Sequence, residues 1–246
     1  LTYLKQRGIS REQILKWKIG YCSEGRYGGR IIIPSFNNSG NINYFIARSY
    51  VGHQRKYLNP RANKDIIFNQ LSVDWDSPVI LVEGVFDAIV AGENAIPILG
   101  STLRENTKLF QAIAINDTPV YLALDEDAKK KTGQIVKNML QYDIELLEID
   151  TSGCEDVGSM SHDVFLERKN QARPVDYDNF FLYNALKNRQ LAGAALDVFS
   201  NEPPLESPLL TLDNFLASPH CGGSSQEGVL AMGKSAINHL VKYFHK

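Results

Sequence analysis

The sequence predicts an α/β protein built on a parallel sheet, and two observations lead to that prediction. Short apolar runs, VILV at 79–82 and VYLAL at 120–124, each stop directly at an acidic residue, Glu83 and Asp125. Runs of four or five apolar residues suit strands that are buried on both faces. Between residues 78 and 149 such runs also alternate with helix-like segments, which is typical of βαβ units in a parallel sheet.

The elements of this sheet follow one another along the chain. Strands are expected at 79–83, 96–99, 119–124 and 144–149. Helices are expected at 86–93, directly after Ser101-Thr102 with Thr102 as the cap, at 128–141 and at 161–170.

Residues 1–75 predict a smaller α+β module ahead of the sheet. Its expected elements are a helix at 11–18 capped by Ser10 and two strands at 30–36 and 42–50, joined by a turn at 37–40. Residues 185–246 differ in character, because small residues dominate LAGAALDVF at 191–199 and prolines follow it. There we expect two strands, LAGAALDVF and FLASPH, and a helix from about Ser225.

The composition is that of an ordinary globular protein, with 43% hydrophobic and 22% charged residues. No apolar run approaches the ~18 residues of a membrane span, and no charged-then-apolar leader opens the chain. The three cysteines are odd in number and far apart, which indicates a reducing compartment. We therefore expect a cytoplasmic protein without membrane contact. The first residue is Leu1 rather than Met, so the chain is expected to be a piece of a longer protein.

Charge is distributed unevenly along the chain. Residues 1–60 hold ten Lys and Arg residues against two acidic residues, a net charge of +8. Because the whole chain has a net charge of -2, the remainder carries -10. A basic first part and an acidic second part suggest that one part holds a polyanion while the other acts on it. The alternative is that the basic residues only solvate the surface.

Acidic residues gather where the two predicted strands end. Glu83 and Asp87 follow the first strand, and Asp125 and Asp127 follow the second. Ligands bind at the carboxyl ends of the strands in open α/β sheets. Carboxylates gathered there repel one another unless a cation lies between them, and Mg2+ prefers such oxygen ligands. The sequence therefore predicts a divalent-metal site that handles phosphates. The alternative is that the acids cap helices, which suits Asp87 in the first helical turn.

Three acidic segments, EGVFD at 83–87, LDEDA at 124–128 and EDVGSM at 155–160, together resemble a TOPRIM domain. Primases, topoisomerases and related nucleases share this fold. Further segments resemble the catalytic core of a DnaG-type primase over about residues 1–170: YLKQRGIS at 3–10, GGRIIIPSF at 28–36, Ala47-Arg48, KYLNP at 56–60, IFN at 67–69 and GSTL at 100–103.

This resemblance implies a metal-dependent nucleotidyltransferase that makes short RNA primers on single-stranded DNA during replication. It implies Glu83, Asp125 and Asp127 as catalytic residues that hold Mg2+ or Mn2+, supported by Asp87 and Asp156. The implied contacts to template or nucleotide are Arg30, Arg48, Lys56 and Asn59. The implied partners are single-stranded DNA, ribonucleotides and a replicative helicase. The family usually carries a zinc ribbon before this core, and this sequence has none.

The last quarter of the chain resembles a different family. LAGAALDVF, NEPP at 201–204 and SPHCGGSSQEG at 218–228 are similar to the end of a D-isomer-specific 2-hydroxyacid dehydrogenase, close to phosphoglycerate dehydrogenase. The match implies a Glu202–His220 relay and Arg173 as the substrate-carboxylate ligand. NAD is not expected, because the chain has no GxGxxG turn. We expect this segment to be inactive, and either less ordered than the core or added to the edge of the sheet.

The fold class expected from the sequence is thus α/β, with three domains: a primase-like basic subdomain at 1–75, a TOPRIM domain with flanking helices at 76–170, and a dehydrogenase-like fragment at 171–246. Besides a primase, three functions stay open. They are a TOPRIM nuclease or topoisomerase, an NAD-dependent 2-hydroxyacid dehydrogenase, and a nucleic-acid-binding remnant without activity.

Overall fold

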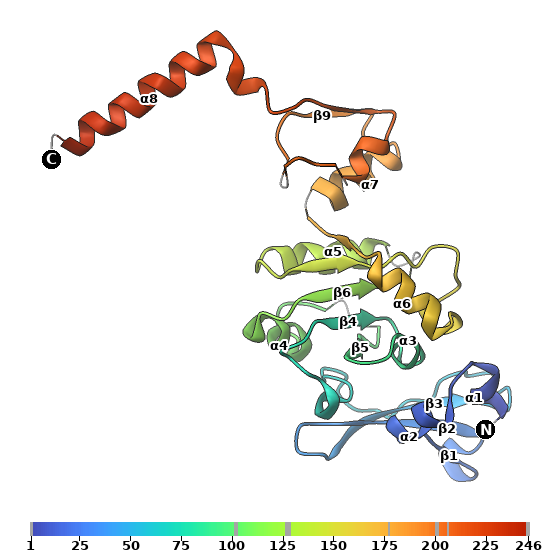
Figure 1. Ribbon diagram of the computed structural model, residues 1–246. Coiled ribbons are helices and arrows are strands. Elements are labelled where there is room, and N and C mark those ends of the chain that lie inside the picture. Colours follow the sequence, from blue (N-terminus) through green and yellow to red (C-terminus); the bar gives the residue numbers. More distant parts are fainter. Residues whose placement is uncertain are drawn as a thin grey trace. The chain divides into compact units, whose positions relative to one another are not determined.

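The protein forms two compact units, Leu1–Val175 (unit 1) and Asp176–Lys246 (unit 2). The computed structural model describes residues 2–100, 103–125, 129–176, 178–199, 202–205 and 207–244 (Figure 1). Unit 1 contains two sheets, one with three strands and one with five, and unit 2 contains a separate sheet of two strands. The mixed α/β architecture predicted from the sequence is confirmed. No described helix has the length and apolar character that a membrane crossing requires.

The five-stranded sheet is the centre of unit 1, with strand order β5-β4-β6-β7-β8. Its strands are β4 (Val79–Val82), β5 (Ala95–Pro97), β6 (Val120–Ala123), β7 (Leu146–Glu148) and β8 (Arg173–Pro174). The first four are parallel, as the sequence predicts, and β8 adds an antiparallel edge. All four residues of β4 are buried, because helices cover both faces of the sheet.

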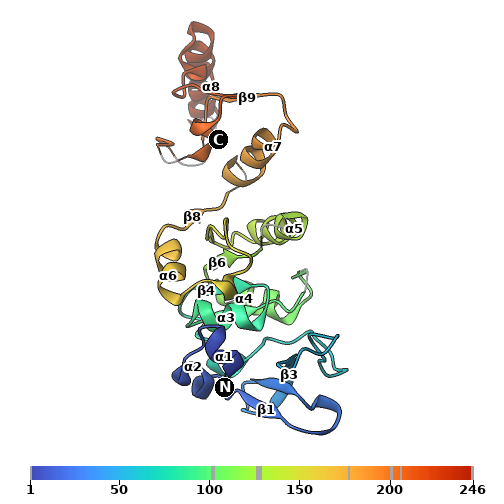
Figure 2. The same cartoon turned by 90° about the vertical axis from the view of Figure 1, so that its right-hand side faces the viewer.

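Helices lie on both faces of this sheet, and Figure 2 shows α5 and α6 on opposite sides of β4 and β6. The helices of this region are α3 (Val85–Ala91), α4 (Lys108–Asn116), α5 (Lys129–Leu140) and α6 (His162–Asn170), with a short 3-10 turn η4 (Val157–Ser159) before α6. Every residue of α3 is buried, and α3 packs against both α6 and η4. Helix α3 is therefore an inner element that begins directly beside the carboxyl end of β4.

The first helix after β5 begins later than the sequence predicts. We expected it to start directly after Thr102, with Thr102 as its cap, but α4 begins at Lys108, with Thr107 at its N-cap position. The Lys108 N–H donates to Asp65 Oδ1 at 2.9 Å. Asp65 precedes it by 43 residues, so the cap is provided by tertiary structure, and local sequence patterns do not reveal it. Thr102 itself lies outside the described residues.

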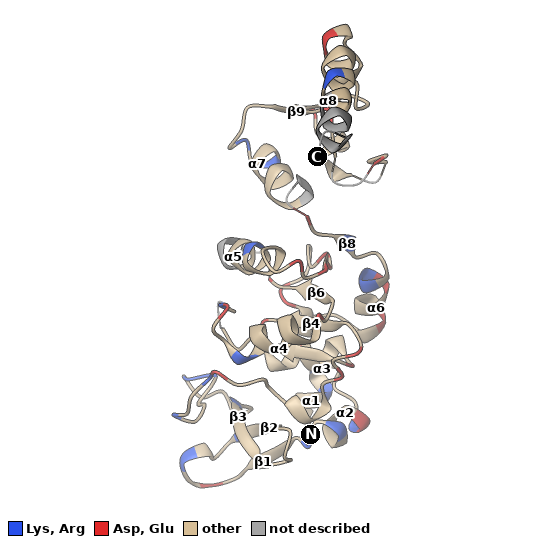
Figure 3. Cartoon of the chain, turned by 90° about the vertical axis from the view of Figure 1, so that its left-hand side faces the viewer, with Lys and Arg blue, Asp and Glu red and all other residues tan. Residues whose placement is uncertain are grey.

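The first 60 residues build a three-stranded antiparallel sheet with two short helices. These elements are α1 (Thr2–Gln6), α2 (Arg11–Lys16), β1 (Gly20–Cys22), β2 (Arg30–Phe36) and β3 (Ile42–Ser49). Ser10 caps α2, as the sequence predicts, and Gln13 completes a reciprocal capping box with it. Basic residues, blue in Figure 3, lie on α1 and α2 and on the loops beside β1 and β3. This module therefore carries the positive charge seen in the sequence.

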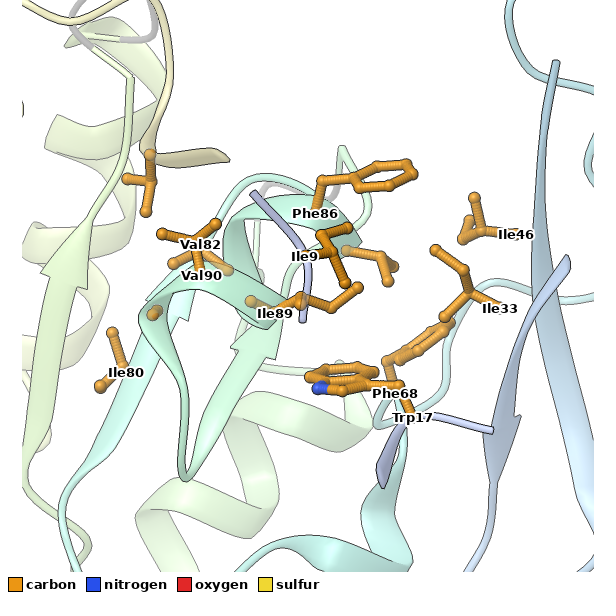
Figure 4. Close-up of a cluster of buried hydrophobic side chains, with 14 of the residues drawn as sticks. Ile9, Trp17, Ile33, Ile46, Phe68, Ile80, Val82, Phe86, Ile89 and Val90 are labelled. Atoms are coloured by element: carbon orange, nitrogen blue, oxygen red, sulfur yellow. The ribbon is translucent and has the colours of Figure 1, made fainter. Parts of the chain in front are cut away.

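A shared hydrophobic core joins the module to the five-stranded sheet. Figure 4 shows Ile80 and Val82 of β4, Ile89 of α3, and Ile33 and Ile46 of the module in one cluster. Trp17 and Phe68 fill the same cluster, with ring centroids 6.5 Å apart. Because α3 contributes to both sides, the position of the module is coupled by packing to the start of α3.

Tyr44 of β3 carries a buried hydroxyl for which the described part of the chain provides no hydrogen-bond partner. We expect Tyr44→Phe to leave the free energy of unfolding unchanged or to raise it by about 1 kcal/mol, because it removes a buried polar atom. Chemical denaturation measures this. Tyr3→Phe is the matched control, since the Tyr3 hydroxyl accepts a 2.9 Å hydrogen bond from Arg48 Nε. A loss of stability in Tyr44→Phe as large as in Tyr3→Phe would contradict the prediction.

Unit 2 has a parallel strand pair and its own helices. Its elements are a π-helical turn (Asp178–Leu182), α7 (Tyr183–Lys187), β9 (Ala194–Leu196), β10 (Phe215–Ala217) and α8 (Gln226–Phe244). We expected this segment either to be less ordered than the core or to add to the edge of the main sheet. The second alternative is wrong for β9 and β10, because they pair with each other and neither joins the five strands of unit 1. Arg189 Nη2 donates to both carboxylate oxygens of Asp213, at 3.0 and 2.9 Å, and so links the turn after α7 to the segment before β10.

Candidate metal and nucleic-acid site

Glu83 and Asp125 lie at the carboxyl ends of two neighbouring parallel strands. Glu83 directly follows β4, and Asp125 lies two residues after β6. These strands are in register with Val82 opposite Ala123, so both acids are close to the same edge of the sheet. One carboxylate oxygen of each, Glu83 Oε1 and Asp125 Oδ1, is buried. Buried oxygens of this kind are suitable ligands for a hard divalent cation.

Asp87 joins two of the acidic segments through its carboxylate. Its Oδ2 accepts the Gly84 N–H at 2.8 Å and closes the capping box of α3. Its Oδ1 accepts the Gly158 N–H, also at 2.8 Å, although Gly158 lies 71 residues further along the chain. Gly84 directly follows Glu83, and Gly158 lies two residues after Asp156. The carboxylate of Asp87 therefore holds the first and third acidic segments together.

Burial raises the pKa of Asp87 to about 6. The two backbone N–H donors oppose this increase, while the nearby carboxylates of Asp156 and Glu83 add to it. Asp87 is only 7% exposed. Burial is the main cause of the raised pKa, and the carboxylates of Asp156 and Glu83 are each close enough to Asp87 to contribute.

The donor chemistry of this region fits Mg2+ or Mn2+, but the described residues alone form no complete ligand set. Asp156 is half-buried at the start of η4. No group of three His, Cys, Asp or Glu side chains poised to hold a metal occurs among the residues that the structure describes. Asp127, predicted as a ligand, lies outside the described residues. The acids that the structure brings together are Glu83, Asp87 and Asp156, with Asp125 on the adjacent strand end.

Arg30 is bound to the protein backbone. Only 4% of this residue is exposed. Its Nη1 donates to the carbonyl of Lys56 at 3.2 Å, and its Nη2 donates to that of Arg55 at 3.0 Å. Asn59 is also engaged, since its Oδ1 accepts the Ala47 N–H. In this geometry Arg30 fixes the loop that contains Lys56, whose side chain is exposed.

Arg48 lies in a cluster of basic and aromatic side chains. Its guanidinium stacks over Tyr57, 4.7 Å from the ring centroid, and its Nε donates to the Tyr3 hydroxyl. Tyr57 is 46% exposed, so part of its ring is open to a ligand. Exposed aromatic rings beside basic groups are the usual platform on which bases of single-stranded nucleic acids stack.

Arg7 extends this cluster toward the acidic segments. Its guanidinium lies 4.8 Å from the ring centroid of Phe86, the residue before Asp87. Partial burial raises the pKa of Tyr57, Arg48 and Arg7 oppose the increase, and Tyr3 and Asp87 add to it. Asp87 is thus within electrostatic reach of Tyr57. Sequence analysis missed Arg7 and Tyr57, although both lie in the segments RGIS and KYLNP that it singled out.

In unit 2, Glu202 and His220 form the pair that the sequence predicts. His220 Nδ1 and Glu202 Oε2 are 2.9 Å apart. Asp197 accepts N–H donors from Cys221 and Gly222 and so holds the turn that carries His220. Arg173, the proposed substrate ligand, belongs to β8 in unit 1. Two of the three dehydrogenase-like residues are therefore paired within one unit.

The hydrogen bond to Glu202 raises the pKa of His220 above its ordinary value. This stabilises unit 2 at pH values below the ordinary histidine pKa, and the contribution is lost as pH rises through the raised value. We expect Glu202→Gln to shift the His220 pKa downward in an NMR titration, because the neutral amide no longer favours imidazolium. His53 of unit 1 is the internal control. An unchanged His220 titration would contradict the pairing.

Comparison with solved structures assigns the fold of unit 1. A structure described as the DnaG primase catalytic domain bound to single-stranded DNA matches with a TM-score of 0.61 and 20% identity, over 76% of this chain and 75% of that one. Because unit 2 is less than a third of the chain, this match lies mainly in unit 1. Unit 1 has the fold of a DnaG primase catalytic core. The Escherichia coli primase catalytic core matches with a TM-score of 0.60 and 18% identity, over 88% of this chain and 84% of that one.

The C-terminal part has a different similarity. The family model described as "D-isomer specific 2-hydroxyacid dehydrogenase, NAD binding domain" matches residues 158–222. D-3-phosphoglycerate dehydrogenase of Methanocaldococcus jannaschii is 45% identical over 73 residues, which are 30% of this chain. The chain spans only 14% of that relative's length. The match begins at residue 158, inside unit 1, so the dehydrogenase-like sequence crosses the boundary between the units.

Proposed function

We propose that unit 1 is the catalytic core of a DNA primase, which joins ribonucleotides into short primers on single-stranded DNA with Mg2+ or Mn2+. The observation that carries the proposal is the position of the carboxylates. Glu83 and Asp125 stand at neighbouring strand ends of a primase-core fold, and Arg7, which lies over Phe86 beside Asp87, belongs to the basic and aromatic cluster of the same unit. A replicative helicase is the expected protein partner by the same resemblance.

In this proposal Glu83, Asp125 and Asp127 hold the metal ions, and Asp156 supports them. Bound divalent ions would neutralise charge on the reacting phosphoryl oxygens. Asp87 engages both carboxylate oxygens in backbone hydrogen bonds, which favours a bracing role at the start of α3. Arg48 and Lys56 contact phosphates, and the exposed part of the Tyr57 ring stacks on a base. Arg30 and Asn59 keep the 55–60 loop in place.

Primer synthesis with labelled ribonucleotides on single-stranded DNA tests this proposal directly. We expect oligoribonucleotide products that require Mg2+ or Mn2+ and disappear when EDTA is added. DNA binding is measured in parallel by fluorescence anisotropy. Retained DNA binding with no product under either metal would favour a binding remnant without activity. Cleavage of DNA instead of synthesis would favour the nuclease alternative.

A second candidate activity rests on the Glu202–His220 hydrogen bond of unit 2. In the resembled dehydrogenases such a pair moves a proton to or from the substrate oxygen. The chain has no GxGxxG turn, so we propose that unit 2 does not bind NAD. Titration with NADH, followed by its fluorescence, tests this. Saturable binding of NADH would favour the dehydrogenase alternative, and the absence of NADH binding would agree with the proposal.

A further inference from the structure

The carbonyl of Leu124, directly before Asp125, is held by a side chain. Strands β6 and β7 pair in parallel, and Ile149 N–H donates to the Leu122 carbonyl at 2.8 Å. In this register the next acceptor along β6 is the carbonyl of Leu124, two residues further on. That carbonyl accepts the Thr151 hydroxyl, with Oγ1 at 2.9 Å. A side-chain hydroxyl thus extends the ladder past the end of the strand.

The residues on either side of Thr151 are held by hydrogen bonds. Arg168 Nη1, from α6, donates to the carbonyls of Asp150 and Ser152 at 2.8 and 2.9 Å. The Ser152 N–H in turn donates to Asp150 Oδ1. Thr151 is only 9% exposed, and its bond to Leu124 is buried. The hydroxyl therefore has little freedom to leave the Leu124 carbonyl.

This hydrogen bond holds the peptide group between Leu124 and Asp125, and the orientation of that peptide affects the direction of the Asp125 side chain. Beyond Ala123 the chain leaves β6, so strand pairing no longer fixes the backbone. Holding the Leu124 carbonyl fixes the peptide that enters Asp125, whose Oδ1 is buried. Residues that orient metal ligands without touching the metal typically change its affinity by about 10- to 100-fold when removed.

We propose that Thr151 is a positioning residue for the metal site, which sets the direction of Asp125 through the Leu124 carbonyl. The inference rests on the proposed function, because it takes Asp125 as a metal ligand. Thr151 touches neither metal nor substrate. Its hydroxyl couples the loop after β7 to the end of β6, so that the second and third acidic segments keep a fixed geometry.

Thr118 supplies a matched control. It lies just before β6, at the opposite end of the same strand, and is 1% exposed. Its hydroxyl also donates to a backbone carbonyl, that of Trp75, at 2.9 Å. Thr118→Val and Thr151→Val each remove one buried hydroxyl and keep the side-chain shape. The two variants should therefore lose similar thermal stability, and only one of them changes the predicted metal site.

The experiment measures Mn2+ affinity by electron paramagnetic resonance, together with the melting temperature, for the full chain and its variants. We expect Thr151→Val to raise the Mn2+ dissociation constant about tenfold or more, while Thr118→Val leaves it unchanged. Thr151→Ser should restore binding because it restores the donor. Thr151→Ala serves as a second variant without a donor if the valine variant does not fold.

Equal Mn2+ affinity in Thr151→Val, Thr118→Val and the unaltered chain would overturn the inference. Primer synthesis separates this failure from that of the proposed function. If Mn2+ affinity depends on Thr151 but the chain makes no primers, the positioning role of Thr151 is supported and the primase proposal is overturned. An unaltered chain that binds no Mn2+ would overturn the metal site and the inference together.

Discussion

Asp125→Ala is expected to lower the initial rate of Mg2+-dependent primer synthesis by at least about 100-fold, the loss typical of removing one charge-stabilising group from an active site. Asp125 presents a buried carboxylate oxygen at the end of β6, beside the strand that ends at Glu83. Without it, the cations that would neutralise the reacting phosphates lose a ligand that no neighbouring water replaces with the same charge. Labelled-primer assays over a range of Mg2+ concentrations measure the effect.

The variant should remain folded. Asp125 follows the end of β6, so alanine there leaves the strand pairing of the sheet intact, and circular dichroism should show unchanged secondary structure. Asp76→Ala is the control, because Asp76 is exposed and lies ahead of β4, at the other end of the sheet. It should retain full activity. Primer synthesis by Asp125→Ala at the rate of Asp76→Ala would show that Asp125 is not part of the site.

Local sequence patterns were sufficient for the main sheet and for the place of the acids. Four or five apolar residues that stop at a carboxylate gave β4 and β6 to within one residue at most ends. Such a run, bounded by turn residues, favours an inner strand, and the acid that ends it then lies at the carboxyl end of that strand. The Glu83-x-x-x-Asp87 spacing similarly placed Asp87 in the first turn of α3. These features depend on residues close together in sequence.

Features that depend on distant contacts were not predictable in this way. Arg30 was assigned to nucleic acid because a guanidinium suits phosphate, yet its donors engage the carbonyls of Arg55 and Lys56. The start of α4 depends on Asp65, and the short edge strand β8 depends on β7. The bonds of Asp87 to Gly158 and of Thr151 to Leu124 span 71 and 27 residues. No local pattern encodes such pairings.

Gly158→Ala is expected to lower the free energy of unfolding of unit 1 by about 1–3 kcal/mol, the cost of a buried polar group that loses its partner. A Cβ at Gly158 would lie 2.8 Å from Asp87 Oδ1, closer than such atoms can approach. The Asp87 carboxylate must then move away from the Gly158 N–H. Since that donor lowers the pKa of Asp87, its loss also disfavours the ionised carboxylate. Chemical denaturation of the metal-free chain measures the change.

Gly133→Ala is the matched control for this substitution. Gly133 lies within α5, and a Cβ there meets no other atom within 4 Å. Alanine should therefore stabilise the helix by up to about 1 kcal/mol through its higher helix propensity. Gly158→Ala should also weaken primer synthesis, because the Asp87 carboxylate that moves away from the new Cβ no longer links the first and third acidic segments. If both glycine variants were equally stable and active, the Asp87–Gly158 bond would not hold the acidic segments together.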